Sequence, residues 1–253
     1  GIRPLKHANY VIARTDQEVV PGVIGGWRAR IVRLPIIELR SVKRPAAAYH
    51  LEQIGVPKAH TITKGEGTSV AIIDTGVDVT HEQLNGKVVA GYDFVCDRDG
   101  CVDDNGHGTH VAGLVAGDSV GAAPGAALYA AKVLDANGSG NEATVGLGID
   151  WAIDRLPTLI NMSLGSPQPS PMEEALVQAA LEAGITICAA AGNEGRGKSY
   201  PAAYAGVISV AAVDHHNEHA YFSNIDPTVD VSAPCVDIMS CVPGGYAKLS
   251  GTS

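Results

Sequence analysis

The sequence predicts an α/β protein with a doubly wound, mostly parallel sheet covered by helices on both faces. From about residue 46 onwards, short apolar runs of strand length alternate with longer stretches of helical character. Continuously apolar runs are typical of strands buried on both faces, and their alternation with helices favours a parallel sheet. The expected strands are 69–74, 125–134, 158–164, 184–192 and 206–213, and the expected helices are 107–117, 143–154 and 171–184.

Local signals support the helix at 171–184. Pro171 suits a first helical turn, and Gly184 suits the position just past a helix end. A further apolar segment at 235–241 reads as a strand.

The first 45 residues differ from the rest of the chain. They are rich in Arg and Lys, contain strand-like pieces at 9–14 and 28–39, and end at a dibasic step, Lys43-Arg44, before Pro45. We therefore expect an N-terminal extension or partial propeptide at 1–45 and the doubly wound domain at 46–253. The chain begins at Gly1 without a signal peptide and ends on Ser253 inside an apparent motif, so we expect both ends to be cut and the C-terminal part of the domain to be missing.

Composition excludes two classes of function. The net charge of −9 argues against a nucleic-acid partner, because such proteins are usually basic. No run of about 18 apolar residues occurs, so no membrane span is expected. The hydrophobic fraction of 45% suits a single well-buried core.

Five cysteines leave at least one thiol outside any intramolecular disulfide. Cys96 and Cys101 bracket a short turn and can pair. An extended segment from Cys235 to Cys241 would span roughly 20 Å, far more than a disulfide allows, so these two should not pair unless the segment bends. Cys188, within an apolar run, is expected to be a buried thiol.

Polar residues interrupt the pattern at four places. Asp74 ends the strand 69–74, and in open α/β sheets sites form at the carboxyl ends of strands. There it can orient a histidine or simply cap a turn. His107 lies between two glycines at the start of a helix. With His110 it could bind a metal, but the zinc-protease pattern needs histidines four apart with an intervening Glu, which this segment lacks.

The other two interruptions are Asn193 and Ser253. Asn193 follows the strand 184–192, where its amide can donate to a developing oxyanion and contribute roughly 3–4 kcal/mol, or serve turn geometry alone. Ser253 is the last residue of the tripeptide Gly-Thr-Ser. This tripeptide is too short to indicate a function alone, and it becomes informative only because it follows Asp74, His107 and Asn193 in the chain.

That order is specific. The segments 72–84, 105–117, 160–167, 189–195 and 249–253 resemble the signature blocks of the subtilisin-like serine proteases, the subtilase family, whose catalytic residues follow the order Asp, His, Ser. Further similarity covers nearly all of 48–253. The resemblance implies a serine endopeptidase acting on polypeptides, secreted, and requiring no cofactor for its chemistry.

By this resemblance Ser253 is the nucleophile, His107 the general base and acid, and Asp74 the residue that orients the imidazole. Asn193 and the Ser253 backbone amide form the oxyanion hole, whereas His110 is structural.

The resemblance also implies a substrate cleft in which an extended peptide lies between two strand edges. Its expected lining residues are Gly138, Ser139, Gly140, Ser163, Leu164, Gly165, Ala190, Ala191, Gly192, Glu142 and Glu194. The small residues predict a roomy, apolar primary pocket and broad specificity. Glu142 stands where the family often has an aromatic residue at an outer subsite, and the two glutamates predict tolerance for basic side chains unless both are merely solvated.

A structural Ca²⁺ is also expected by resemblance. The short segment 113–125 predicts that a strong calcium loop is absent, while the carbonyls of Ala202, Tyr204 and Val207 with the Asp230 carboxylate match a weaker site. Residues 1–45 occupy the place of the family's propeptide, a partner that inhibits and assists folding, although a plain extension is the alternative.

Other features of the sequence bear on two alternative functions. A non-catalytic, protein-binding pseudoprotease or inactive fragment is favoured by the chain ending at Ser253, without the helix that would support the nucleophile, although the motifs are intact. A flavodoxin-like nucleotide binder is disfavoured, because no phosphate-binding glycine motif follows the first strand.

Overall fold

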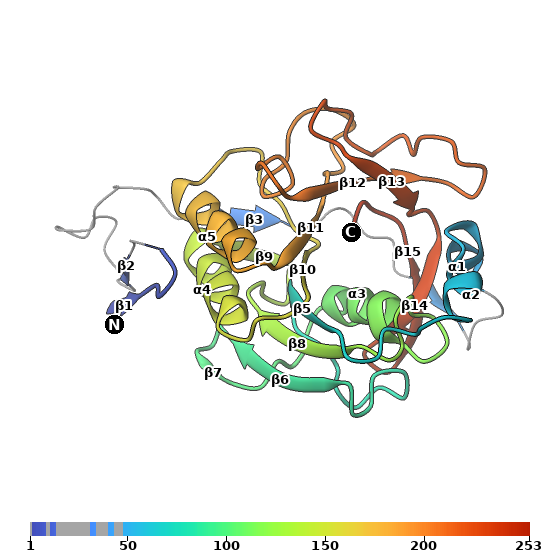
Figure 1. Cartoon of the computed structure of the whole chain (residues 1–253), viewed down its shortest axis with the longest axis horizontal. Coiled ribbons are helices and arrows are strands. Elements are labelled where there is room, and N and C mark those ends of the chain that lie inside the picture. Colours follow the sequence, from blue (N-terminus) through green and yellow to red (C-terminus); the bar gives the residue numbers. More distant parts are fainter. Residues whose placement is uncertain (1, 9–10, 14–30, 34–39, 43–47) are drawn as a thin grey trace.

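The computed structural model describes residues 2–8, 11–13, 31–33, 40–42 and 48–253. Within them the central element is an eight-stranded sheet with the strand order β13-β12-β11-β10-β5-β8-β6-β7 (Figure 1). Its strands are β5 (Ser69–Asp74), β6 (Val88–Asp93), β7 (Arg98–Asp99), β8 (Ala127–Lys132), β10 (Leu159–Met162), β11 (Thr186–Ala190), β12 (Ile208–Val213) and β13 (Val231–Pro234). All neighbours pair in parallel except β6 and β7, which confirms the expected fold class.

The helices are α1 (Tyr49–Gln53), α2 (Val56–Ala59), α3 (His107–Ala116), α4 (Glu142–Ile153) and α5 (Pro171–Glu182). Pro171 is the first helical residue of α5 after the N-cap Ser170, and Gly184, with φ +80°, follows the C-cap. Both local signals are therefore confirmed.

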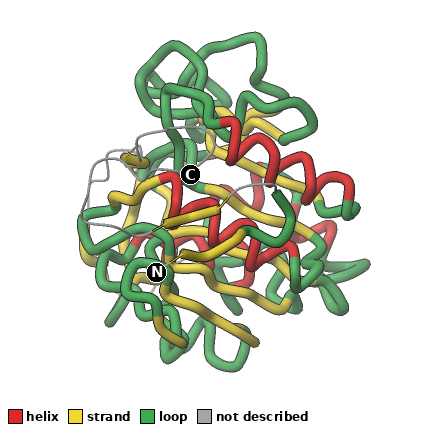
Figure 2. Tube along the Cα trace, turned by 90° about the vertical axis from the view of Figure 1, so that its left-hand side faces the viewer, coloured by secondary structure: helices red, strands yellow, loops and turns green. Residues whose placement is uncertain are grey.

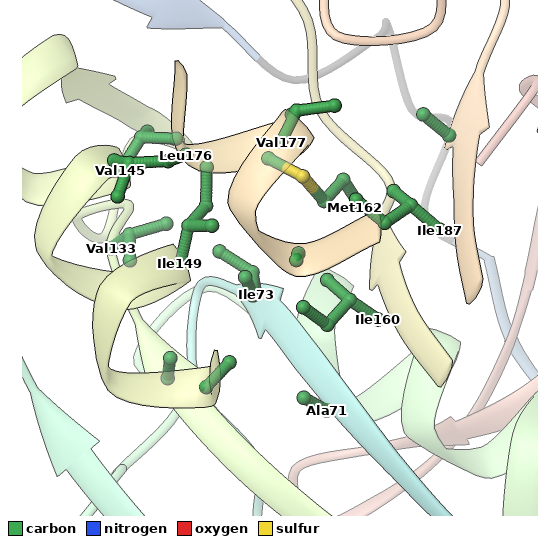
Figure 3. Close-up of a cluster of buried hydrophobic side chains, with 14 of the residues drawn as sticks. Ala71, Ile73, Val133, Val145, Ile149, Ile160, Met162, Leu176, Val177 and Ile187 are labelled. Atoms are coloured by element: carbon green, nitrogen blue, oxygen red, sulfur yellow. The ribbon is translucent and has the colours of Figure 1, made fainter. Parts of the chain in front are cut away.

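The helices divide the core into two layers because side chains alternate across β5. Ala71 and Ile73 face α4 and α5 in a large apolar cluster, which Figure 3 shows with Val145, Ile149 and Leu176 pointing into it. Val70 and Ile72, on the opposite face, pack in a second cluster with α3. Burial on both faces explains why the strand is apolar at successive positions.

The sheet order reverses between β5 and β10. From β5 the chain first adds β6 and β8 on one side and later β10, β11, β12 and β13 on the other. A crevice at the carboxyl edge of such a sheet is the usual place for a site, and the residues that follow β5, β10 and β11 meet there.

Shorter strands connect the N-terminal segment to the domain. Strand β3 (Ile31–Arg33) pairs antiparallel with β9 (Ser139–Asn141), and β4 (Arg40–Val42) pairs antiparallel with β15 (Gly245–Leu249), which also pairs with β14 (Ile238–Val242). Strands β1 (Ile2–Pro4) and β2 (Val11–Ala13) form a separate pair.

The start of the chain docks on α4. The Asp150 carboxylate accepts hydrogen bonds from the backbone amides of Lys6 and His7 at 3.1 and 2.8 Å. Asp154 pairs with the Lys6 ammonium and with the His7 ring, while Leu5 is buried. The Lys6 ammonium lowers the pKa of Asp154, which also has the His7 ring beside it.

Three expectations about the cysteines and the segment 235–241 need correction. Cys96 and Cys101 are free thiols, because Cys96 is exposed whereas Cys101 is buried with its Sγ directed at the Val77 carbonyl. Cys188 is only half-buried. The segment 235–241 bends at Asp237, which has φ +53°, so that the strand begins at Ile238. Cys235 and Cys241 are both free.

The C-terminal residues lie toward the middle of the molecule in both views (Figure 1, Figure 2). In the part of the chain that the structure describes, no helix has the length and apolar character needed to cross a bilayer.

Candidate active site

Asp74 and His107 meet at the carboxyl edge of the sheet. Asp74 is the last residue of β5 and His107 the first of α3, and the His107 Nδ1 lies 2.8 and 3.0 Å from the two carboxylate oxygens of Asp74. Asp74 is fully buried and His107 is 3% exposed. A carboxylate can only accept, so this contact fixes the imidazole with its hydrogen on Nδ1 and leaves Nε2 available as a base.

The loop before α3 is held by a carboxylate that sequence reasoning missed. Asp103 is buried and accepts hydrogen bonds from the Gly106 amide, the Thr75 hydroxyl, and the amide and hydroxyl of Thr109. Thr75 follows Asp74 directly, so Asp103 ties the Asp74 turn to the first turn of α3. Its position four residues before His107 is the only sequence signal that could have suggested this role.

Gly108 allows α3 to approach β5 closely. A Cβ at this position would lie 2.1 Å from the Gly76 carbonyl oxygen and 3.2 Å from the Asp74 Cβ. Its amide instead donates to the Thr75 hydroxyl at 2.9 Å. The glycine after His107 is therefore needed for packing against the Asp74 turn rather than for exposing the ring, which is buried.

Asn193 lies three residues after β11 with its side-chain amide held in one orientation. Its Oδ1 accepts from both the backbone amide and the hydroxyl of Thr252, each at 2.9 Å. A backbone N–H is an obligate donor, so the atom facing it must be the oxygen. The Asn193 Nδ2 is consequently a donor that is buried and lacks a hydrogen-bond partner among the described residues.

Ser253 lines one small pocket together with His107. Its hydroxyl donates to the Ser163 carbonyl at 3.3 Å. Ser253 also lines a cavity of about 190 Å³ together with Ser163 and Ala190. Thr252, the residue before Ser253, donates to Asn193 as described above. Its hydroxyl also accepts from the Gly192 amide at 3.1 Å, so Thr252 ties Ser253 to the loop that carries Asn193.

His110 serves the fold. Its Nε2 lies 3.0 Å from the Ile238 carbonyl and 3.3 Å from the Ala247 carbonyl, so that the ring joins α3 to β14 and β15. Burial, together with the nearby His107, lowers the pKa of His110 to about 3. A neutral imidazole that donates to two carbonyls fits the expected structural role and not a metal pair with His107.

The residues predicted to line the substrate cleft are divided among three places. Gly138, Ser139 and Gly140 lie at β9, whose edge is paired with β3. Ser163, Leu164 and Gly165 follow β10, and Ala190 is the last residue of β11, with Ala191 and Gly192 directly after it. Of these, Ser163 and Ala190 line the cavity beside Ser253.

Glu194 is engaged with a residue that the sequence did not single out. Its Oε2 accepts from the Asn224 Nδ2 at 2.9 Å, and its amide donates to the Asn224 Oδ1 at 3.0 Å. Asn224 is buried, and its Nδ2 also donates to the Ala191 carbonyl at 3.0 Å. Glu194 and Asn224 thus brace the loop that carries Asn193, a contact across thirty positions with no local sequence signal.

Two of the four expected cation ligands already accept hydrogen bonds within the protein. The Tyr204 carbonyl accepts from the Val207 amide at 3.3 Å, and the Asp230 Oδ2 accepts from the Ser209 amide at 2.9 Å. Within the described residues no cluster of three or more His, Cys, Asp or Glu side chains could hold a metal. A Ca²⁺ at Ala202, Tyr204, Val207 and Asp230 stays a prediction, because each oxygen retains a second lone pair.

A buried carboxylate–imidazole pair, a hydroxyl in the same pocket and a free amide donor together suit acyl transfer by a nucleophilic hydroxyl. Comparison with known proteins agrees with this class. Residues 65–253 match the model of the subtilase family.

The chain is 47% identical to a thermostable alkaline protease of Halalkalibacterium halodurans over 75% of this chain and 54% of that protein. It is 42% identical to Subtilisin Savinase of Lederbergia lenta over 80% of this chain and 77% of that protein. The match therefore spans only about half of the first relative's length. The crystal structure of a cold adapted subtilisin-like serine proteinase superposes with a TM-score of 0.72, at 36% identity over 76% of this chain and 71% of the other. The chain belongs to the subtilase family of subtilisin-like serine proteases.

Proposed function

We propose that the protein hydrolyses peptide bonds through Ser253, His107 and Asp74, as a serine endopeptidase. Ser253 attacks the scissile carbonyl and forms an acyl-enzyme. His107 accepts the hydroxyl proton at Nε2 and returns it to the leaving amine, and water then releases the acyl group by the same steps. Asp74 stabilises the imidazolium, and the Asn193 Nδ2 with the Ser253 amide donates to the oxyanion.

One observation carries this proposal most directly. The His107 Nδ1 lies 2.8 Å from the Asp74 carboxylate, which is fully removed from solvent. His107 is the first residue of α3, and Asp74 is the last residue of β5, on which α3 packs. Burial of a charged side chain is costly unless it is paired, so this arrangement is expected where orientation of the imidazole matters.

We further propose broad specificity for extended polypeptides. Small residues dominate the ends of β10 and β11 beside Ser253, and β9 already pairs its backbone with an extended segment of this chain, β3. Secretion and a zymogen form stay predictions from family membership.

A second function is favoured by one contact. The Ser253 hydroxyl donates to the Ser163 carbonyl, a geometry that also suits a non-catalytic, peptide-binding relative. We expect the full-length protein to digest unfolded casein and the Ser253→Ala variant to lose at least 10³-fold of this rate while still binding peptides, roughly the scale of losing a triad member. Equal digestion by both proteins would contradict the catalytic assignment, and binding without digestion by the wild type would favour the second function.

We also propose that the N-terminal segment inhibits the site as a propeptide does. Strand β3 occupies the β9 edge, and β4 pairs with β15, which ends four residues before Ser253. Residues 34–39 between β3 and β4 lie outside the described residues.

A synthetic peptide of residues 28–42 should therefore raise KM without changing kcat in casein digestion. A peptide with the same residues in scrambled order is the control. An unchanged KM at peptide concentrations of about 1 mM, equivalent to a binding free energy weaker than about −4 kcal/mol, would contradict the inhibitory role.

A further inference from the structure

A buried lysine lies next to Asp74. Lys132 is the last residue of β8 and is the partner of Asp74 in the parallel pairing of β8 with β5. Its side chain is 2% exposed. The Nζ donates to three oxygens, namely the Thr75 carbonyl at 2.7 Å, the Asp104 carboxylate at 2.7 Å and the Leu134 carbonyl at 2.8 Å. An ammonium carries three hydrogens, so each of them has an acceptor.

The three acceptors belong to the segments that carry the candidate active site. Thr75 follows Asp74, and its amide donates to the Asp74 Oδ1 at 2.7 Å. The Leu134 amide donates to the Asp74 carbonyl at 3.2 Å. Asp104 lies three residues before His107, in the loop that leads into α3. The ammonium therefore joins the turn after β5 to the loop before α3.

Thr75 is held by two buried charges of opposite sign. Asp103 accepts from its hydroxyl at 2.9 Å, and Lys132 donates to its carbonyl. The Thr75 amide is bound to Asp74. Because the hydroxyl, the carbonyl and the amide are all engaged, Thr75 cannot shift without breaking one of these bonds. The carboxylate of Asp74 is fixed with it.

A contribution to stability alone does not account for this lysine. Transfer of an ammonium into the protein interior is costly, and a buried ion pair can often be replaced by apolar residues without loss of stability. The ionic partner, Asp104, is about half exposed, and solvent screens such a pair. The two carbonyls that Lys132 binds, on either side of Asp74 in space, give a better reason for its presence.

We propose that Lys132 is a positioning residue that keeps Asp74 aligned with His107. It acts through Thr75 and Asp104, without contact with the reacting groups. This inference deepens the proposed peptidase function and rests on it. A small misplacement of a catalytic group can slow the chemical step strongly while substrate binding is unchanged. Loss of the ammonium should therefore lower kcat and leave KM nearly unchanged.

Two substitutions in the full-length protein break the link from its two ends. Lys132→Met keeps most of the side-chain volume and removes the donors, whereas Asp104→Ala removes the half-exposed acceptor. We expect kcat for a peptide amide to fall about 10- to 100-fold in Lys132→Met and roughly fivefold in Asp104→Ala. KM should stay within about twofold of wild type in both. Asp104→Ala decides alone if Lys132→Met fails to fold, which circular dichroism shows.

Lys87→Met is the matched control. Lys87 is also largely buried, with 13% of its side chain exposed, and it donates to the Pro124 carbonyl and pairs with Asp118. These partners lie outside the candidate active site. We expect this variant to lose Tm but to keep the wild-type kcat at a temperature at which all variants are folded. A kcat that falls as far in Lys87→Met as in Lys132→Met follows stability rather than position, and it overturns the proposal.

Proton NMR adds a measurement that requires no hydrolysis. The hydrogen on the His107 Nδ1 points at the Asp74 carboxylate, and its resonance lies downfield of the backbone amides. This resonance should shift or broaden in Lys132→Met and stay in place in Lys87→Met. An active wild type whose folded variants keep the wild-type kcat, or keep this resonance unchanged, overturns the positioning role alone. A wild type that does not hydrolyse peptides overturns the proposed function, and the resonance then still decides whether Lys132 positions Asp74.

Discussion

An Asp74→Asn substitution is expected to lower kcat/KM for peptide hydrolysis by about 10⁴-fold, a magnitude known for this change in other triad proteases. The physical reason lies in the contact with His107. Both oxygens of Asp74 lie within 3.0 Å of the Nδ1, and Oδ1 also accepts from the Thr75 amide at 2.7 Å. The Asn oxygen would stay at the Oδ1 position on the obligate Thr75 donor, so the NH₂ group would take the Oδ2 position, 3.0 Å from Nδ1, where it donates to the ring and favours the tautomer with hydrogen on Nε2. That tautomer cannot accept the serine proton.

The measurement is steady-state hydrolysis of a peptide ester and a peptide amide. Asp118→Asn is the control, because its carboxylate is exposed and pairs with Lys87 at the surface, and we expect its activity to stay within twofold of wild type, as is usual for exposed ion pairs. A folded Asp74→Asn protein that retains more than about a tenth of the wild-type kcat/KM would contradict the assignment of His107 as base.

Substitution of Asn193 is expected to lower kcat by about 10²–10³-fold with little change in KM, a magnitude measured on subtilisin itself. The Nδ2 has no hydrogen-bond partner among the described residues, so it is available to bind charge that develops only during the reaction. Two variants separate this role from support of the loop. Asn193→Ala removes both the donor and the acceptor that holds Thr252, whereas Asn193→Asp keeps the acceptor and removes the donor.

If the donor matters, both variants lose kcat, but Asn193→Asp retains more of the wild-type Tm. The comparison requires kcat, KM and thermal unfolding for the same preparations. A loss confined to KM, or full activity in Asn193→Asp, would show that this amide does not act on the transition state.

The site residues that could be predicted are those at the ends of helices and strands. Asp74 and His107 could be predicted because one ends an apolar strand and the other begins a helix, and the topology of a parallel sheet brings those ends together. The core strands were predictable for a similar reason, since burial on both faces leaves continuous apolar runs such as 69–74.

The supporting residues could not be predicted in this way. Asp103, Asn224 and Thr252 act through hydrogen bonds made by loops, and loop contacts leave no periodic pattern in the sequence. Docking of Lys6 and His7 on α4 joins residues more than 140 positions apart. The bend at Asp237 was missed because a single residue with positive φ delays the start of the strand to Ile238, and no Gly or Pro within 235–241 marks it.

The same limit applies to the two glutamates that were predicted to line the cleft. Glu142 and Glu194 looked equivalent in the sequence, yet Glu194 is bound to Asn224 thirty positions away, whereas Glu142 is the first residue of α4. Only a contact between distant loops distinguishes the bracing carboxylate from the other.

Labelling with a fluorophosphonate tests the central claim most directly, because this reagent forms a covalent bond only with a serine hydroxyl that is activated as a nucleophile. The full-length protein is incubated with the probe, digested with trypsin and analysed by mass spectrometry. The account predicts one adduct on Ser253 that is lost in Ser253→Ala and strongly reduced in His107→Ala. A folded wild-type protein that remains unlabelled at Ser253, or that carries the adduct on another serine, would contradict it.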